Sequence, residues 1–239
     1  VKYRIKRENG EMAGGPMYLL ERGMKMRSIA IVFAVFTVIA SFGIGNMVQS
    51  NSIAVMLEES VGASRWMSGL VMAFFTALVI LGGIRSIAKV CEFFVPLMAV
   101  FYILGCLALL AFKYETLPQT LELIITSAFT GQAALGGFLG AGMKEAIRYG
   151  IARGLFSNES GLGSAPIVAA AARTKNPVEQ ALISSTGTFW DTVVVCLLTG
   201  LVLVNSGEWT QGLKGAALTK AAFSKLPVFG TLLMNFGLF

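Results

Sequence analysis

Long apolar runs alternate with short polar segments along this chain, and that alternation predicts membrane-spanning helices. A helix needs about 20 mostly apolar residues to cross a bilayer. We expect spans at about 29–57, 66–84, 93–111, 127–155 and 180–204, and a sixth apolar run begins at 228. Between the spans we expect a basic link at 85–92, short helices after Pro118 and around 215–224, and a turn at 174–177. Residues 16–25 fit either a short amphipathic helix at the membrane surface or a solvated loop.

Composition supports a multi-pass, all-α membrane protein. Apolar residues make up 55% of the chain and charged residues 13%, whereas soluble domains carry about 25% charge. There is no His, and the three cysteines are scattered without a CxxC pair, so neither a zinc site nor a disulfide framework is indicated. The net charge of +6 is spread over short loops, which argues against a nucleic-acid partner.

The cationic residues indicate an orientation in the membrane. With alternating spans, 14 of the 19 Lys and Arg residues fall on one side, in the segments 1–27, 85–92 and 144–175. Because cytoplasmic loops are enriched in Lys and Arg, residues 1–27 and 157–175 are predicted to be cytoplasmic. Proline near the start of the third span, at Pro96, is expected in a first helical turn, where it is tolerated.

Polar side chains within the first span suggest a binding site. Asn46 and Gln49 lie three residues apart, hence on one helix face, and follow two glycines. Polar groups at membrane depth are costly and tend to face a cavity or the protein interior. A solute site is favoured over the alternative, in which the amides only make hydrogen bonds between helices.

The fourth span is interrupted by glycines, which predicts a break in the helix at membrane depth. Irregular backbone is tolerated there only beside protein or a watery cavity, so we expect residues 129–140 to line a solute site. In the fifth span Asp191 is the one acidic residue. It fits either a functional carboxylate or a hydrogen-bonded structural one.

A compact polar signature, SNESGLGSAP at 157–166, follows the fourth span. Ser157 or Asn158 is expected to cap the next helix, Pro166 suits its first turn, and the glycines permit a tight turn. We expect this segment to pack or gate the inner side through Asn158, Glu159, Gly161, Gly163 and Pro166.

Several segments together resemble the alanine or glycine:cation symporter family, which comprises sodium-coupled amino-acid carriers of prokaryotes. They are GEMAGGPMYLLERGMK, SFGIGNMVQSNSIA, TALVILGGIRSIAKV, SAFTGQAALGGFLGA and IRYGIARGLFSNESGLGSAPIVAAAARTKNPVEQA. The resemblance covers the whole chain. Two positions depart from the common pattern: Ser160 stands where Ala is common, and Ala169 where His is frequent.

The resemblance implies the leucine-transporter-type fold of two inverted five-helix repeats. Starting in a charged segment and stopping in an apolar run, the chain is expected to be an internal part of a longer carrier. Residues 1–27 would then be a cytoplasmic juxtamembrane segment, and 28–126 would hold helices three to five. Residues 127–239 would hold the broken helix six, the signature turn, helix seven and the start of helix eight.

The resemblance also implies a substrate site and ion ligands. Such carriers bind substrate near the midplane, where broken helices expose backbone groups. Substrate contacts are expected from Gln49, Asn46, Phe129, Thr130, Gly131, Gln132, Gly136 and Gly137. Sodium, the coupling ion, prefers oxygen ligands, and Thr130, Thr186 and Thr188 are the candidates.

The expected function is therefore sodium-coupled symport of alanine or glycine into a prokaryotic cell across the inner membrane, without a cofactor. Proton coupling through Asp191 is the alternative. An enzyme is disfavoured, because the sequence offers no His, no paired carboxylates and no nucleophile–base arrangement at membrane depth. A purely structural membrane subunit is disfavoured by Asn46, Gln49 and the broken helix.

Overall fold

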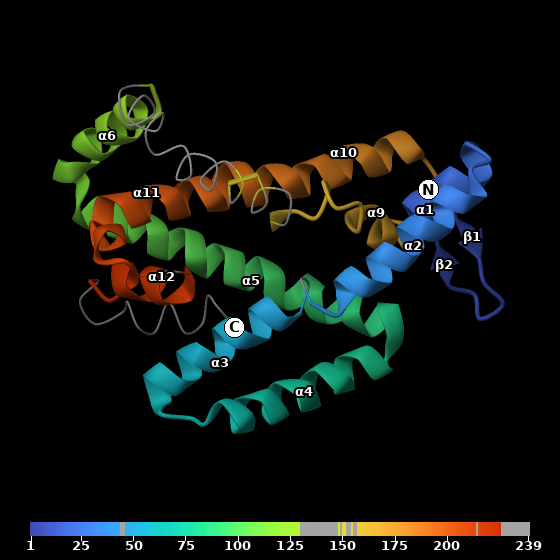
Figure 1. Ribbon diagram of the computed structural model, residues 1–239, viewed down its shortest axis with the longest axis horizontal. Coiled ribbons are helices and arrows are strands. Elements are labelled where there is room, and N and C mark those ends of the chain that lie inside the picture. Colours follow the sequence, from blue (N-terminus) through green and yellow to red (C-terminus); the bar gives the residue numbers. More distant parts are fainter. Residues whose placement is uncertain are drawn as a thin grey trace. The chain divides into compact units, whose positions relative to one another are not determined.

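The computed structural model is mostly helical (Figure 1). Its residues group into two compact units. It describes residues 1–43, 46–129, 148, 150–151, 154, 157–213 and 215–225. Unit 1 combines Val1–Ile44 with Phe129–Cys196, and unit 2 combines Gly45–Ala128 with Leu197–Phe239. The expected spans at 127–155 and from 228 therefore lie almost wholly outside the described residues.

Unit 1 begins with a small hairpin and a helical turn. Strands β1 (Ile5–Lys6) and β2 (Met12–Ala13) pair antiparallel. They are followed by α1 (Pro16–Tyr18), the π-helical η1 (Leu19–Gly23) and the apolar α2 (Arg27–Ser41). Of the two interpretations of residues 16–25, the helical one is confirmed over 16–23. The expected helical character is confirmed for most of the described residues. The hairpin is a local exception that was not predicted: Gly10 adopts a positive φ of 82° and donates its N–H to Arg7 O at 2.9 Å.

The second part of unit 1 includes the signature and the helices that follow it. These are α9 (Ala165–Ala169), α10 (Pro177–Thr188) and the π-helical η3 (Phe189–Val195). The turn at 174–177 is confirmed: the Asn176 side chain accepts the backbone N–H of Val178 at 2.9 Å and so caps α10. Proline at Pro177 fits the first helical turn because its missing N–H would have no partner there.

Unit 2 holds the other helices whose bounds fall within the described residues. They are α3 (Met47–Val61), α4 (Arg65–Leu81), α5 (Gly83–Phe112), η2 (Tyr114–Thr116), α6 (Leu117–Phe129), α11 (Cys196–Ser206), η4 (Glu208–Gln211) and α12 (Gly215–Phe223). Within the unit, α3 packs on α4 and α12, and α4 packs on α5. The short helices expected after Pro118 and around 215–224 are confirmed as α6 and α12.

Three expectations about helix boundaries are corrected. The first span is not one helix: α2 ends at Ser41, where Phe42 and Gly43 donate their N–H groups to Ile39 O and Ala40 O in a tightened last turn. The link at 85–92 is helical, because α5 begins already at Gly83. Pro96 consequently lies inside α5 rather than in a first turn, where it removes one backbone hydrogen bond.

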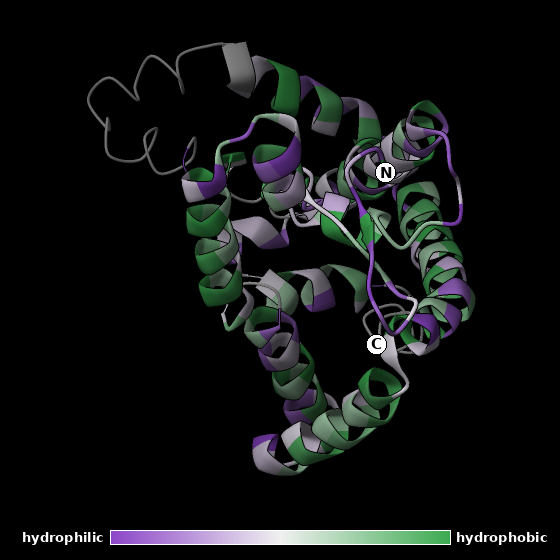
Figure 2. Cartoon of the chain, turned by 90° about the vertical axis from the view of Figure 1, so that its right-hand side faces the viewer, coloured by the Kyte–Doolittle hydropathy of each residue, from purple (hydrophilic) through white to green (hydrophobic). Residues whose placement is uncertain are grey.

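Two helices among the described residues are long and apolar enough to cross a membrane. They are Gly83–Phe112 and the continuous run Pro177–Ser206, whereas Arg27–Ser41 and Arg65–Leu81 are shorter apolar helices. Large apolar side chains stand exposed along them, among them Phe36 at 65% and Trp66 at 83%. Figure 2 shows hydrophobic colour along much of the helices. A surface of this kind is expected where lipid or further protein covers the helices.

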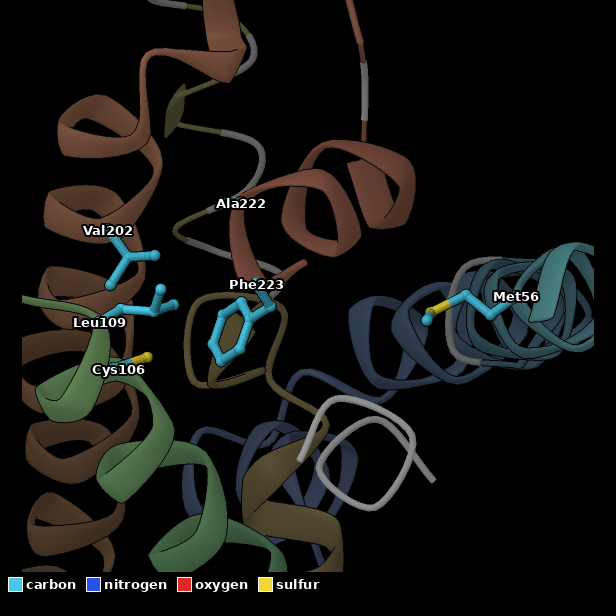
Figure 3. Packing of buried hydrophobic residues seen from close by; sticks show 6 residues of the cluster. All are labelled: Met56, Cys106, Leu109, Val202, Ala222 and Phe223. Atoms are coloured by element: carbon cyan, nitrogen blue, oxygen red, sulfur yellow. The ribbon is translucent and has the colours of Figure 1, made fainter. Parts of the chain in front are cut away.

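The buried core of unit 2 gathers around α12. Phe223 and Cys106 are fully buried, and Phe223 stacks on Tyr102 with ring centroids 5.7 Å apart. Figure 3 shows Phe223 pointing toward Cys106 and Leu109, while Met56 reaches in from α3. The buried side chains of α12 therefore hold α3, α5 and α11 together.

Candidate functional site

A short π-helical segment interrupts the long helix 177–206 and carries polar side chains within its apolar part. Thr188 immediately precedes η3, and Asp191 and Thr192 lie within it. These residues are three and four positions apart, a spacing that places side chains on neighbouring parts of one helix surface. Single π-helical turns are rare and occur frequently at functional sites.

The signature folds into a turn with strong internal bonding. Asn158 Oδ1 accepts the N–H of Ser160 at 3.0 Å, and Ser164 Oγ donates to Glu159 Oε2 at 2.8 Å. Gly163 has a positive φ of 77°, which suits glycine, and Glu159 has one of 54°, which is uncommon for other residues. Pro166 stands in the first turn of α9, as expected.

The expected cap of α9 by Ser157 or Asn158 is wrong. Ser164 occupies the N-cap position and makes no side-chain capping bond. The side chains of Ser157 and Asn158 are instead engaged with η3. The sequence spacing favoured a local partner, whereas the structure gives these residues partners more than 30 positions away.

Three contacts join the signature to the π-helical segment. Ser157 Oγ donates to Asp191 Oδ2 at 2.5 Å, and Asn158 Nδ2 donates to Thr192 Oγ1 at 3.0 Å. The hydroxyl oxygens of Ser160 and Thr188 lie 3.3 Å apart. We call the set the polar cluster: Ser157, Asn158, Ser160, Thr188, Asp191 and Thr192.

The polar cluster brings one carboxylate, four hydroxyls and one amide together where the signature contacts the helix 177–206. Oxygen atoms of these kinds are the ligands that hard cations prefer. The described residues contain no group of three His, Cys, Asp or Glu side chains that could hold a metal ion. A monovalent cation, or a proton on Asp191, fits this chemistry better than a transition metal does.

The two threonines expected to bind sodium from the fifth span differ in their surroundings. Thr188 belongs to the polar cluster, whereas the Thr186 hydroxyl donates to Ile183 O of its own helix at 2.7 Å. Residues two positions apart do not share a helix face. The joint binding of one ion by both side chains therefore stays a prediction, and the third candidate, Thr130, lies outside the described residues.

The expected substrate contacts are described only in part. Asn46 stands at the N-cap of α3 and Gln49 in its first turn, and both are exposed. Phe129 is the last residue of α6. Thr130, Gly131, Gln132, Gly136 and Gly137 lie outside the described residues, so the predicted break in the fourth span stays a prediction.

Ser157, Ser160 and Thr192 of the polar cluster were not among the expected site residues. Thr192 could have been found from sequence, because it lies four positions after Thr188 on an apolar helix. Ser157 could not, because its partner Asp191 is 34 positions away and nothing local to either residue marks the pairing.

The N-terminal hairpin contacts the segment that follows the signature. Arg4 donates from Nη1 to Ala170 O at 3.0 Å and Ala172 O at 2.6 Å, and from Nη2 to Thr174 O at 2.9 Å. A Cβ at Gly14 would lie 2.7 Å from Ala170 Cβ. Only glycine permits this approach, so the hairpin fixes the end of α9.

Comparison with known proteins identifies relatives of this chain. A profile of the sodium:alanine symporter family matches residues 1–239. The sodium/alanine symporter AgcS of Methanococcus maripaludis is 48% identical over 246 positions, covering 100% of this chain and 53% of AgcS. The probable sodium/glutamine symporter GlnT of Bacillus subtilis is 41% identical, covering 93% of this chain and 46% of GlnT.

A third relative is the putative sodium/proton-dependent alanine carrier protein YrbD of Bacillus subtilis. It is 34% identical to this chain, covering 99% of it and 51% of YrbD. The chain spans about half the length of the curated relatives it matches. The extent of the profile match and these identities lead to one conclusion: the chain belongs to the sodium:alanine symporter family.

Proposed function

We propose that the carrier containing this chain is a sodium-coupled symporter of small neutral amino acids such as alanine and glycine. Family membership supports cation-coupled amino-acid transport, and the relatives with sodium and alanine in their names support the ion and the substrate. A relative named for glutamine makes the size of the substrate side chain the least constrained part of the proposal.

The observation that carries the proposal is the polar cluster. A carboxylate and hydroxyls gathered at a π-helical turn, within a helix apolar enough to cross a membrane, are costly unless they serve a polar ligand or one another. Sodium entering the polar cluster would take oxygens from Thr188, Asp191 and Thr192. In this proposal Ser157 and Asn158 hold the carboxylate and Thr192 in position.

The substrate would bind elsewhere, at the amide-bearing start of α3 and the glycine-rich stretch after Phe129. Exposed backbone N–H and C=O groups at a broken helix suit the carboxylate and ammonium of a zwitterion. We propose Gln49, Asn46 and residues 129–137 as the substrate contacts, within a leucine-transporter-type fold. Loss of uptake in Gln49→Ala, with the purified carrier still folded, would support this assignment.

The coupling ion is tested by uptake of labelled alanine into proteoliposomes that contain the full carrier. Thr188→Val should raise the sodium concentration for half-maximal uptake, because it removes an oxygen from the polar cluster without changing side-chain size. Thr186→Val is the matched control and should leave that concentration unchanged, because the Thr186 hydroxyl bonds within its own helix. If the two variants had the same sodium concentration for half-maximal uptake, the polar cluster would not be the ion site.

Proton coupling through Asp191 is the second candidate. Two observations support this candidate. The Asp191 carboxylate accepts a direct hydrogen bond from Ser157, and the relative YrbD is named as a putative sodium/proton-dependent carrier. Replacing sodium by choline at fixed pH separates the two. Uptake that persists in choline, follows a pH gradient and disappears in Asp191→Asn would favour protons over sodium.

A further inference from the structure

A cluster of cations stands where the hairpin and helical turn of unit 1 lead into α2. Arg22 lies in the last turn of η1, Lys25 follows that turn, and Arg27 is the first residue of α2. All three are exposed. The neighbouring anion is Glu21, whose carboxylate lies 3.9 Å from Arg27 Nε, and the Arg27 side chain stays 80% exposed. We call Arg22, Lys25 and Arg27 the basic turn.

The backbone holds the basic turn in an unusual conformation. Lys25 has a positive φ of 56°, a backbone conformation that residues other than glycine adopt infrequently. The turn is closed by hydrogen bonds from Met24 N to Leu19 O at 3.1 Å and from Met26 N to Leu20 O at 2.8 Å. Two bonds that run back to η1 thus fix the positions from which the three cations project.

Apolar side chains are exposed beside these cations. Leu19, Met24 and Met26 are 45%, 57% and 40% exposed. Exposed methionine and leucine among cations resemble the composition of segments that lie in the membrane interface. The surface of this turn is thus both basic and apolar.

The position of the basic turn follows from chain continuity. Arg27 is two residues from Ile29, where the exposed apolar surface of α2 begins, and two helical residues rise about 3 Å. If α2 enters the bilayer as the proposed topology requires, the basic turn lies at the level of the lipid headgroups. Phosphate-bearing headgroups are the anions present at that level.

We propose that the basic turn is a binding site for an anionic phospholipid of the cytoplasmic leaflet. Its cations contact the headgroup phosphate, and Leu19, Met24 and Met26 enter the upper acyl region. The inference rests on the proposed transporter being a membrane protein in which residues 1–27 lie on the cytoplasmic side, as the distribution of Lys and Arg predicts, and not on the ion or substrate carried. Charge complementarity and continuity with the exposed apolar side of α2 favour lipid over an acidic protein, because a soluble partner would not need apolar contacts at membrane level.

The test uses the full carrier, purified in detergent and titrated with phosphatidylglycerol, with bound lipid counted by native mass spectrometry. Phosphatidylcholine serves as the neutral headgroup. The test variant replaces the basic turn: Arg22→Gln, Lys25→Gln and Arg27→Gln together. The matched control removes three cations from the hairpin: Lys2→Gln, Lys6→Gln and Arg7→Gln together.

The basic-turn variant should weaken phosphatidylglycerol binding at least about tenfold, since each interfacial cation contributes on the order of 1 kcal/mol to attraction by anionic lipid. The hairpin control should bind as the unaltered carrier does. Equal weakening in both variants would mean diffuse charge attraction and would overturn the site. Tight binding of phosphatidylcholine would also overturn the site. Unchanged binding of phosphatidylglycerol by the basic-turn variant would overturn it as well, and is the result expected if the basic turn binds an acidic protein.

A loss of lipid binding must be distinguished from a loss of folding. Thermal unfolding of the basic-turn variant in detergent without added lipid should match that of the unaltered carrier. If it does not, Lys25→Gly, which relieves the positive φ, replaces the triple variant in the lipid titration. The lipid inference and the transport proposal can fail independently. A carrier that binds phosphatidylglycerol at the basic turn yet shows no sodium-dependent uptake would retain the former and lose the latter.

Discussion

Replacing Arg4 should release the segment after the signature from the N-terminal hairpin. One guanidinium satisfies three carbonyl oxygens, those of Ala170, Ala172 and Thr174, at 2.6–3.0 Å. These carbonyls follow the last turn of α9, where helix C=O groups have no partner within the helix. The Arg4 side chain therefore supplies bonds that the local backbone cannot.

The size of the effect follows from those contacts. Hydrogen bonds to charged groups contribute about 1.5–3 kcal/mol each when removed from buried sites. Arg4 is only partly buried and its three bonds share one side chain, so we expect about 2–3 kcal/mol in total for Arg4→Gln. Each 1.4 kcal/mol is a factor of ten, so local opening of residues 170–176 should become about 30- to 140-fold more frequent.

Hydrogen exchange of the full carrier measures this opening directly. Amides of residues 170–176 should exchange faster in Arg4→Gln by that factor, while those of α5 stay unchanged. Arg4→Lys keeps the charge, but its ammonium group lacks the planar fork of donors with which the guanidinium reaches several carbonyls. This variant should therefore restore only part of the protection from exchange. Arg173→Gln, an exposed cation of the same segment, is the control. Unchanged exchange in Arg4→Gln, or full recovery in Arg4→Lys, would refute the reasoning.

Three further predictions concern packing and turns. Phe223→Ala should destabilise the carrier by about 3–5 kcal/mol, because the ring is fully buried; a change below 1 kcal/mol in denaturant unfolding would contradict this. Asn205→Leu should lower thermal stability, because Asn205 Oδ1 lies 2.6 Å from Thr116 Oγ1 and 2.9 Å from Thr120 Oγ1, and Thr120→Val should then add little. Gly163→Ala should cost about 1–2 kcal/mol through its positive φ, measured against Gly187→Ala in an open helical position, which should not destabilise.

The apolar pattern predicted most helices because helix length and hydropathy are local properties. It predicted α4, α6, α10 with α11, and α12 closely. It merged α2 and α3, although Gly43 and the amide of Asn46 mark the boundary, because the apolar residues on both sides continue the run. The hairpin escaped prediction since strands of two residues show no alternation.

The polar cluster was only partly predictable from the sequence. Asp191 and Thr188 stood out as polar groups in an apolar run. Their pairing with Ser157 and Ser160 depends on how the turn folds back on η3, which no spacing rule reports. The π-helical geometry of η3 likewise has no compositional signal, because a π turn uses the same residues as an α turn.

The core around Phe223 has a consequence for how this protein responds to its solvent. Helices inside lipid gain little from the hydrophobic effect on packing together, because acyl chains are as apolar as leucine. The packing of α12 on the ends of α3, α5 and α11 is different if the segment 207–225 lies in water, as the proposed topology has it. Urea weakens the burial of apolar side chains away from water. Chaotropes should therefore loosen this end of unit 2 at concentrations that leave the lipid-embedded helices folded. Harsh detergents should instead disrupt the lipid-embedded helices first.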